Sequence, residues 1–118
     1  MSVEAFYAAI GGNFEGMMAR MRSRERVLRF VRRFPMDGSF ALLESSLEKG
    51  EEREAFRAAH TLKGVCQNLG FDRLYRVSAE LTEALRPGAM RMENVPELME
   101  KTREGYRQVV EAIALMED

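Results

Sequence analysis

Cysteine and histidine each occur once in this chain of 118 residues, proline occurs three times, and tryptophan is absent. With a single cysteine, Cys66, the chain has no internal disulfide, and the apolar residues around it at helical spacing predict a buried, reduced thiol. With a single histidine and no cysteine expected on its face, a metal site is not expected. Cys66 lies six positions beyond that histidine and is expected to point inward, which argues against a paired cysteine–histidine nucleophile.

Long hydrophobic runs are also missing. No apolar run approaches the roughly 20 residues that a membrane-spanning helix needs. The first residues lack a basic segment followed by an apolar one, so a secretory signal is not expected. We therefore predict a cytoplasmic protein without a membrane segment.

The residue types that are abundant favour helices. Ala, Leu, Met, Glu and Arg are frequent and the alternation typical of strands is scarce, so we predict an all-α fold. Hydrophobic residues make up 46% and charged residues 31% of the chain, an ordinary mixture for a soluble protein. The length is that of one domain, so residues 1–118 are expected to share a single core.

Helical periodicity and capping residues divide the chain into segments. Pro35 is expected to end one helix, and Asn13, Asp72 and Asn94 are placed to cap three others. The four longest segments are expected to form an antiparallel four-helix bundle, with additional short helices near the N-terminus. The predicted helices cover residues 2–10, 14–34, 40–49, 51–68, 72–85 and 95–117, and the bundle is assigned to 14–34, 51–68, 72–85 and 95–117.

The single histidine, His60, is predicted to lie on the outer face of its helix. At 100° per residue, Phe56, Lys63, Gly64 and Gln67 share its side, one or two turns away. Gly64 lowers helix stability by about 1 kcal/mol relative to alanine, and close approach of another molecule is one reason to keep a glycine there. The apolar residues fall on the opposite stripe, which is the face that a helix buries: Ala55, Ala58, Ala59, Leu62, Val65, Cys66 and Leu69.

The residues around His60 form a recognisable motif. Residues 58–70 read AAHTLKGVCQNLG, and this stretch resembles the phosphorylation-site signature of histidine-containing phosphotransfer (HPt) domains. Residues 10–15, IGGNFE, resemble the family's entry to its first long helix. The apolar positions of the next helix also fit the family, and the resemblance covers about residues 6–86; these positions are Leu74, Val77, Leu81 and Leu85.

The resemblance implies a role in phosphorelay signalling. HPt domains are built around a four-helix bundle, and His60 would take a phosphoryl group from the phosphorylated aspartate of a receiver domain. Lys63 can pair with phosphoryl oxygens, Gly64 leaves room for the partner, and Gln67 is a further polar group on this face. The family places Mg²⁺ and most catalytic groups on the receiver. The chain is therefore expected to need no cofactor and to act as a carrier, not an enzyme.

One position departs from the family pattern. Many members carry Glu or Gln about 22 residues after the histidine, where it orients the imidazole. Here Thr82 occupies that position and Glu83 follows it, so either of them is a candidate supporting group. Phe56 and Arg57, just before His60, are expected to belong to the surface on which a partner docks.

Arginine is concentrated in one segment. Residues 20–33 contain seven arginines and one acid, Glu25, although the net charge of the whole chain is −1. We expect some of these arginines to steer an acidic receiver towards His60. Nucleic-acid binding is not expected, because the arginines are scattered around the helix and no aromatic platform is interleaved with them.

Two functions from different classes therefore remain. The first is a phosphorelay intermediate, expected to be monomeric, that moves a phosphoryl group between receiver domains or from a hybrid histidine kinase. The alternative is a helical adaptor that binds partners without phosphotransfer, through the segment Arg20 to Arg33. The sequence leaves open which kinase and regulators are involved, and whether the domain stands alone or belongs to a larger protein.

Overall fold

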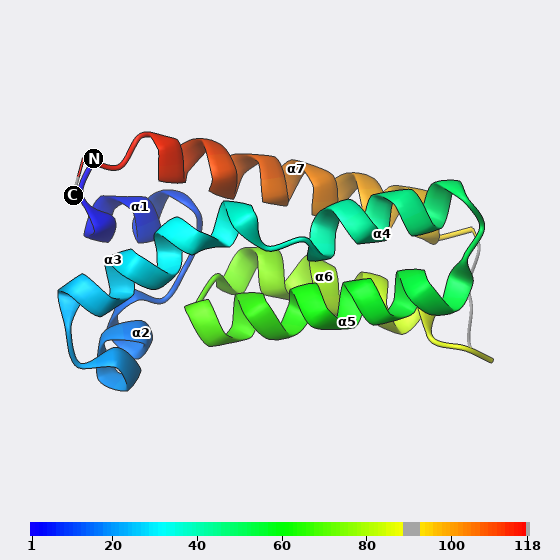
Figure 1. The fold of residues 1–118 in the computed structure, drawn as a ribbon, viewed down its shortest axis with the longest axis horizontal. Coiled ribbons are helices and arrows are strands. Elements are labelled where there is room, and N and C mark those ends of the chain that lie inside the picture. Colours follow the sequence, from blue (N-terminus) through cyan, green and yellow to red (C-terminus); the bar gives the residue numbers. More distant parts are fainter. Residues whose placement is uncertain (89–92, 118) are drawn as a thin grey trace.

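The computed structural model describes residues 1–88 and 93–117, and this part of the chain is helical (Figure 1). Within it, no helix has the length and apolar character needed to cross a membrane. The elements are α1 (Val3–Ala9), α2 (Phe14–Met21), α3 (Arg24–Arg33), the short 3-10 helix η1 (Phe34–Met36), α4 (Ser39–Glu48), α5 (Glu52–Leu69), α6 (Asp72–Leu85) and α7 (Val95–Ala114).

An antiparallel bundle of α4, α5, α6 and α7 forms the main body, so the predicted all-α bundle is confirmed. Each of these helices packs against the next one along the chain. In Figure 1, α5 and α6 lie beside each other, while α4 and α7 lie above them. The assignment of residues 14–34 to the bundle was wrong, because the ten-residue helix α4 takes that place.

The predicted helix over residues 14–34 is two helices, and the break has a local cause. Arg22 adopts the left-handed conformation with φ 59°, and its N–H donates to the carbonyl of Met18. Ser23 then starts α3, because its hydroxyl accepts a hydrogen bond from the N–H of Arg26. A serine at an N-cap position therefore divides a segment whose apolar spacing looks continuous. The predicted stop at Pro35 is confirmed, since α3 ends at Arg33.

Three expected caps have different outcomes. Asn13 caps α2, and its side-chain oxygen accepts from the N–H of Gly16 at 3.0 Å. Asp72 is the first residue of α6 and Phe71 holds the N-cap position, so the assignment of Asp72 was wrong. Asn94 does hold the N-cap position of α7, but its side chain makes no capping hydrogen bond.

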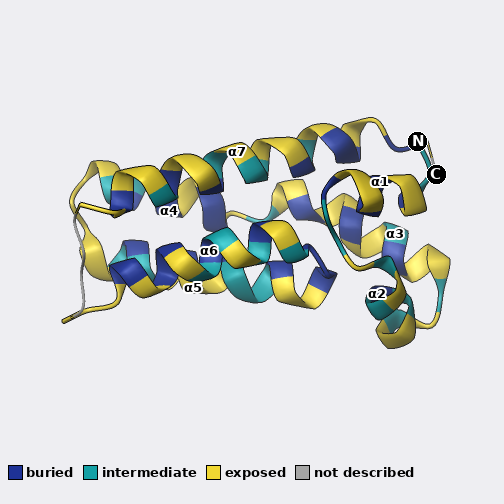
Figure 2. Ribbon diagram, turned by 180° about the vertical axis from the view of Figure 1, so that it is seen from behind, coloured by how far each residue is buried: buried dark blue, intermediate teal, exposed yellow. Residues whose placement is uncertain are grey.

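An aromatic cluster joins the N-terminal helices to the bundle. The ring of Phe71, at the α5–α6 turn, lies 5.7 Å from the ring of Phe6 and 5.1 Å from that of Phe34. Tyr7 is buried beside them, and its hydroxyl donates to the carbonyl of Leu69 at 2.6 Å. Figure 2 shows that the buried faces of the helices turn towards one another. Helices α1 to α3 thus share the core of the bundle.

The C-terminal end of α5 is held by hydrogen bonds from α2 and from the segment before it. The N–H of Asn13 donates to the carbonyl of Gly70 at 2.8 Å, and the guanidinium of Arg20 donates to the carbonyl of Asn68 at 2.8 Å. These contacts satisfy carbonyls that a helix end leaves without intrahelical partners. Gly70 has φ +73°, and a Cβ there would lie 2.9 Å from the Asn13 carbonyl oxygen. The helix that carries His60 is therefore fixed at this end by the N-terminal region.

Candidate functional site

His60 lies in the middle of α5 with its side chain exposed to solvent, as the helical periodicity predicts. The opposite face of α5 is buried, with one exception to the expected stripe. Val65 is only partly buried, and it lines a surface pocket described below. The buried members of the stripe are Ala55, Ala58, Ala59, Leu62, Cys66 and Leu69.

Phe56 forms a platform one turn before the histidine. The ring centroids of Phe56 and His60 are 6.1 Å apart, and the two ring planes differ by 24°. The guanidinium carbon of Arg86, at the end of α6, lies 5.1 Å from the Phe56 ring centroid. The same aromatic ring therefore contacts the imidazole and a guanidinium that comes from the neighbouring helix.

Glu83 binds that guanidinium. Nη2 of Arg86 lies 2.6 Å from Oε2 of Glu83, one turn earlier on α6. This hydrogen bond is the main reason why the pKa of the Glu83 carboxyl lies below its usual value, and the charges of Lys63 and His60 add to the effect. Glu83 is thus in the electrostatic field of the residues that were singled out on α5.

Thr82 and Glu83, the two candidate supporting residues, have different environments. Thr82 is completely buried, and its hydroxyl donates to the carbonyl of Ser78 at 2.7 Å. That hydroxyl proton is therefore engaged within α6, which argues against Thr82 as the group that orients the imidazole. Glu83 is exposed and electrostatically coupled to His60.

The remaining candidate residues line the exposed side of α5. Lys63 and Gly64 are partly buried, while Gln67 and Arg57 are exposed. A Cβ at Gly64 would meet no heavy atom within 4 Å, so no neighbour in the fold requires a glycine there. Arg57 is paired with the carboxylate of Glu54, with 3.2 Å between Nη1 and Oε1.

Sequence reasoning missed Arg86, although a signal for it was present. In an antiparallel pair joined by a short turn, the end of α6 lies beside the early turns of α5. Arg86 follows the last residue of α6, directly before Pro87, and it therefore reaches Phe56. The predicted boundary at residue 85 and the helix pairing place Arg86 near the early turns of α5, but its contact with the Phe56 ring comes from the structure.

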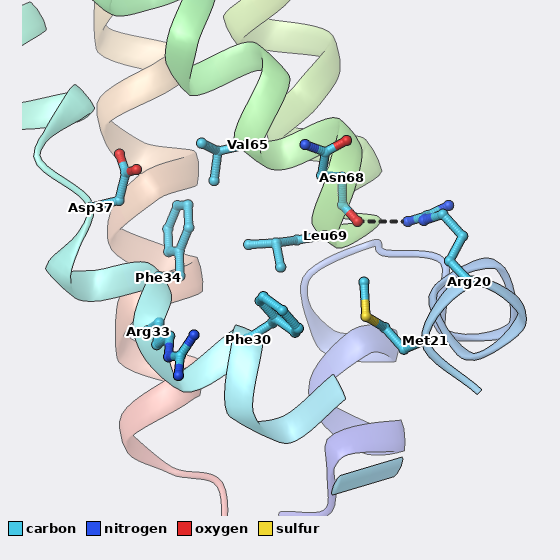
Figure 3. Close-up of a pocket in the computed structure, with 9 residues that line it drawn as sticks. All are labelled: Arg20, Met21, Phe30, Arg33, Phe34, Asp37, Val65, Asn68 and Leu69. Carbon is cyan, nitrogen blue, oxygen red and sulfur yellow. Dashed lines mark hydrogen bonds between the residues drawn. The ribbon is translucent and has the colours of Figure 1, made fainter. Parts of the chain in front are cut away.

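A pocket of about 400 Å³ opens beside the C-terminal half of α5 (Figure 3). Phe30 at its edge is 38% exposed, and the guanidinium carbon of Arg33 lies 5.7 Å from the Phe30 ring centroid. The lining is mainly apolar, with charged groups at the rim. It consists of Arg20, Met21, Phe30, Arg33, Phe34, Asp37, Val65, Asn68 and Leu69.

Three of the seven arginines in residues 20–33 have different neighbours. Arg20 binds the Asn68 carbonyl, Arg24 pairs with Glu4 at 3.0 Å, and Arg33 lies over Phe30. Two of these three border the pocket, and the third joins α3 to α1. The proposed steering by these arginines remains a prediction.

The single thiol and the possible metal ligands were the other reactive groups considered in the sequence. Cys66 is buried as predicted, and burial raises the pKa of its thiol. In residues 1–88 and 93–117, no three His, Cys, Asp or Glu side chains gather in a way that would hold a metal ion.

The fold and the site define a helical-bundle protein that presents a single histidine to solvent from one of the bundle helices. Residues 36–116 match the family model of the Hpt domain, which is more than half of the chain. The chain therefore belongs to the Hpt domain family, whose members carry phosphoryl groups on histidine in phosphorelays and interact with receiver domains and histidine kinases. No curated protein and no solved structure shows significant similarity to the chain.

The matched region differs from the region of resemblance expected from the sequence. The match begins within η1 and extends through α7, whereas the resemblance was expected over residues 6–86. Residues 10–15 lie outside the match, and α2, which begins at Phe14 within them, is a short helix of eight residues. Helices α1, α2 and α3 therefore lie outside the part that the family model describes.

Proposed function

We propose that the chain is a phosphorelay intermediate with His60 as its phosphoacceptor. It would accept the phosphoryl group from the aspartyl phosphate of one receiver domain and pass it to the aspartate of another. One observation carries the proposal: the only histidine of this Hpt domain is exposed on a bundle helix, inside the matched region, with Lys63 one turn away.

The transfer needs little covalent machinery from this chain. The unprotonated ring nitrogen of His60 attacks phosphorus, and the P–O bond to the aspartate breaks with its electron pair staying on the carboxylate. The other ring nitrogen releases its proton to solvent. The reverse sequence delivers the phosphoryl group to the second receiver. An exposed imidazole gives the in-line access that both steps require.

The neighbours of His60 supply charge and space. The Lys63 ammonium neutralises phosphoryl oxygens, and the open backbone at Gly64 lets the receiver approach. Gln67 offers a further hydrogen-bonding group on the same face, while Phe56 and Arg57 form the adjoining docking surface. Mg²⁺ and the remaining catalytic groups belong to the receiver, so the chain is a carrier that works without a cofactor of its own.

The test is transfer of label from a phosphorylated receiver. The wild-type chain should gain an acid-labile phosphoryl label, and His60→Gln should gain none while keeping the same helix content by circular dichroism. Gln108→Ala on α7 is a matched surface control and should be labelled like the wild type. An acid-stable label, or a label that persists in His60→Gln, would refute the proposal.

A helical adaptor remains the second candidate because of the pocket beside α5. Its lining is mainly apolar and carries two arginines, Arg20 and Arg33, against one acid, Asp37, which suits an apolar side chain on an acidic partner surface. An adaptor would bind its partner equally well in the wild type and in His60→Gln, with no label on either. Calorimetry measures binding of the partner, and the labelling assay measures phosphotransfer. The two measurements on the same variants distinguish the two functions. A monomer is expected in both cases.

A further inference from the structure

The ion pair on α6 stands beside the candidate phosphoacceptor. Arg86 contacts the Phe56 ring, and Phe56 stacks with His60. The guanidinium is at the same time hydrogen-bonded to Glu83, a carboxylate that senses the charges of both Lys63 and His60. A second cation thus lies at the edge of the site, held by an anion.

We propose that Arg86 is a second phosphoryl-binding cation of this site and that Glu83 holds it while His60 is unphosphorylated. On phosphorylation, the guanidinium exchanges its carboxylate partner for phosphoryl oxygens. This inference rests on the proposed function of His60 and adds a residue, and a charge exchange, to the same site.

The physical reason is the change of charge. A phosphoryl group on His60 brings a charge of about −1.5 to −2 into a region that already holds the Glu83 carboxylate. The two anions repel each other, and both compete for Arg86. A planar guanidinium binds phosphoryl oxygens through two parallel N–H donors, so it serves the new anion well.

The pair is able to rearrange. The side chains of Arg86 and Glu83 are 47% and 63% exposed, and an ion pair in water is weakly held. Arg86 follows α6 with an extended backbone, ψ 130°, at the point where the helix ends. Its guanidinium carbon lies 5.1 Å from the centroid of the Phe56 ring, whose own centroid lies 6.1 Å from that of His60, so rotation of the long arginine side chain is the movement that the exchange requires.

An ordinary surface pair provides the comparison. Glu104 and Arg107 on α7 have the same three-residue spacing, and both are exposed. Among the described residues, Arg107 pairs with two carboxylates, those of Glu104 and Glu111. Arg86 differs because it also lies over an aromatic ring that contacts the histidine. Arg107→Ala is therefore the matched control for Arg86→Ala.

The experiment uses phosphoramidate as the donor, so that no partner protein is needed. The ring nitrogen of His60 attacks phosphorus, the P–N bond breaks, and ammonia leaves as ammonium with the proton of the other ring nitrogen. Mixtures of phosphoramidate and ammonium at fixed ratio set an equilibrium, and ³¹P NMR measures the fraction of phosphorylated His60.

Two substitutions should shift that equilibrium in opposite directions. Arg86→Ala should lower the ratio of phosphorylated to free chain about threefold to tenfold. Arg86→Lys, which keeps the positive charge, should retain most of the wild-type ratio. Glu83→Gln should raise the ratio about twofold to threefold, because it frees Arg86 and removes a repelling anion. Part of that increase should be lost when Glu83→Gln is combined with Arg86→Ala. Arg107→Ala should not change the ratio.

Failure of this inference differs from failure of the proposed function. If the wild type is phosphorylated on His60 but Arg86→Ala leaves the ratio unchanged, or Glu83→Gln lowers it, the inference is wrong and the phosphoacceptor stands. An equal effect of Arg107→Ala would also overturn it, because the effect would then be general charge. If His60 takes no phosphoryl group from phosphoramidate or from a receiver, both proposals are wrong.

Discussion

The bundle and the N-terminal helices of this protein are held together by different means. Helices α4 to α7 pack along their lengths, each against the next. The N-terminal region, helices α1 to α3, is joined to the bundle by the aromatic cluster at Phe71, by hydrogen bonds to the end of α5 and by contacts of α1 with α7. The family match covers the bundle and omits these three helices. The bundle is thus the part that the family model describes, and the N-terminal region lies outside that part.

The two regions also divide the candidate functions between them. His60, Lys63 and the Glu83–Arg86 pair all come from α5 and α6 of the bundle. The apolar pocket needs both regions, because its walls come from α2, α3 and η1 as well as from α5 (Figure 3). The candidate phosphoacceptor site therefore lies within the region that the family model matches, while the pocket also includes residues outside it.

The largest expected effect comes from the side chain that joins the regions. Phe71→Ala removes a completely buried ring that contacts Phe6, Tyr7 and Phe34. We expect the free energy of unfolding to fall by about 3–5 kcal/mol, because a large cavity remains in the core. This free energy is measured by urea denaturation, with circular dichroism as the readout of unfolding.

A leucine at the surface provides the control for that substitution. Leu115→Ala removes a side chain that is 64% exposed and should change the free energy of unfolding by less than about 0.5 kcal/mol. If Phe71→Ala cost as little, the two regions would not share one core.

Two glycines with the same backbone conformation, one beside the N-terminal region and one away from it, test how firmly that region holds the end of α5. Gly70 and Gly50 have φ +73° and +71°, so alanine is strained by about 1–2 kcal/mol at either position. A Cβ at Gly50 meets no atom within 4 Å, whereas a Cβ at Gly70 lies 2.9 Å from the backbone oxygen of Asn13. Gly70→Ala should therefore cost about 1 kcal/mol more than Gly50→Ala in urea denaturation. Equal decreases in the free energy of unfolding would mean that the segment before α2 moves easily and does not fix the turn at Gly70.

Much of the bundle was accessible from sequence because its signals are local. The apolar stripe of α5 and the glycine at residue 70 predicted its buried face and its end, and the exposure of His60 followed from the same periodicity. The break at Arg22 was missed, because apolar spacing continues through it and only the cap at Ser23 marks it. The choice of bundle helices then went wrong, because length favoured residues 14–34 over α4.

The features of the site that could not be predicted from the sequence are the ones that depend on how the helices are oriented against one another. Arg86 reaches Phe56 from α6, and Thr82 turns its hydroxyl to Ser78 within its own helix. Which of two adjacent residues faces a neighbouring helix depends on the rotation of α6 about its axis. Thr82 and Glu83 lie only 100° apart around that axis. The pocket likewise depends on the packing of α2 and α3 against α5, which no single segment encodes.

The substitution with the smallest expected effect on stability is at Gly64, a glycine that the packing of the bundle does not require. Gly64 lies inside α5, and a Cβ there meets no atom within 4 Å, unlike the Cβ at Gly70. Gly64→Ala should therefore raise the free energy of unfolding by up to about 1 kcal/mol, since alanine favours the helix. If the glycine serves the approach of a receiver, the same substitution should slow phosphotransfer from a receiver while leaving phosphorylation by phosphoramidate unchanged. A stabilised variant that reacts at the wild-type rate with both donors would show that the open backbone at Gly64 has no role in docking.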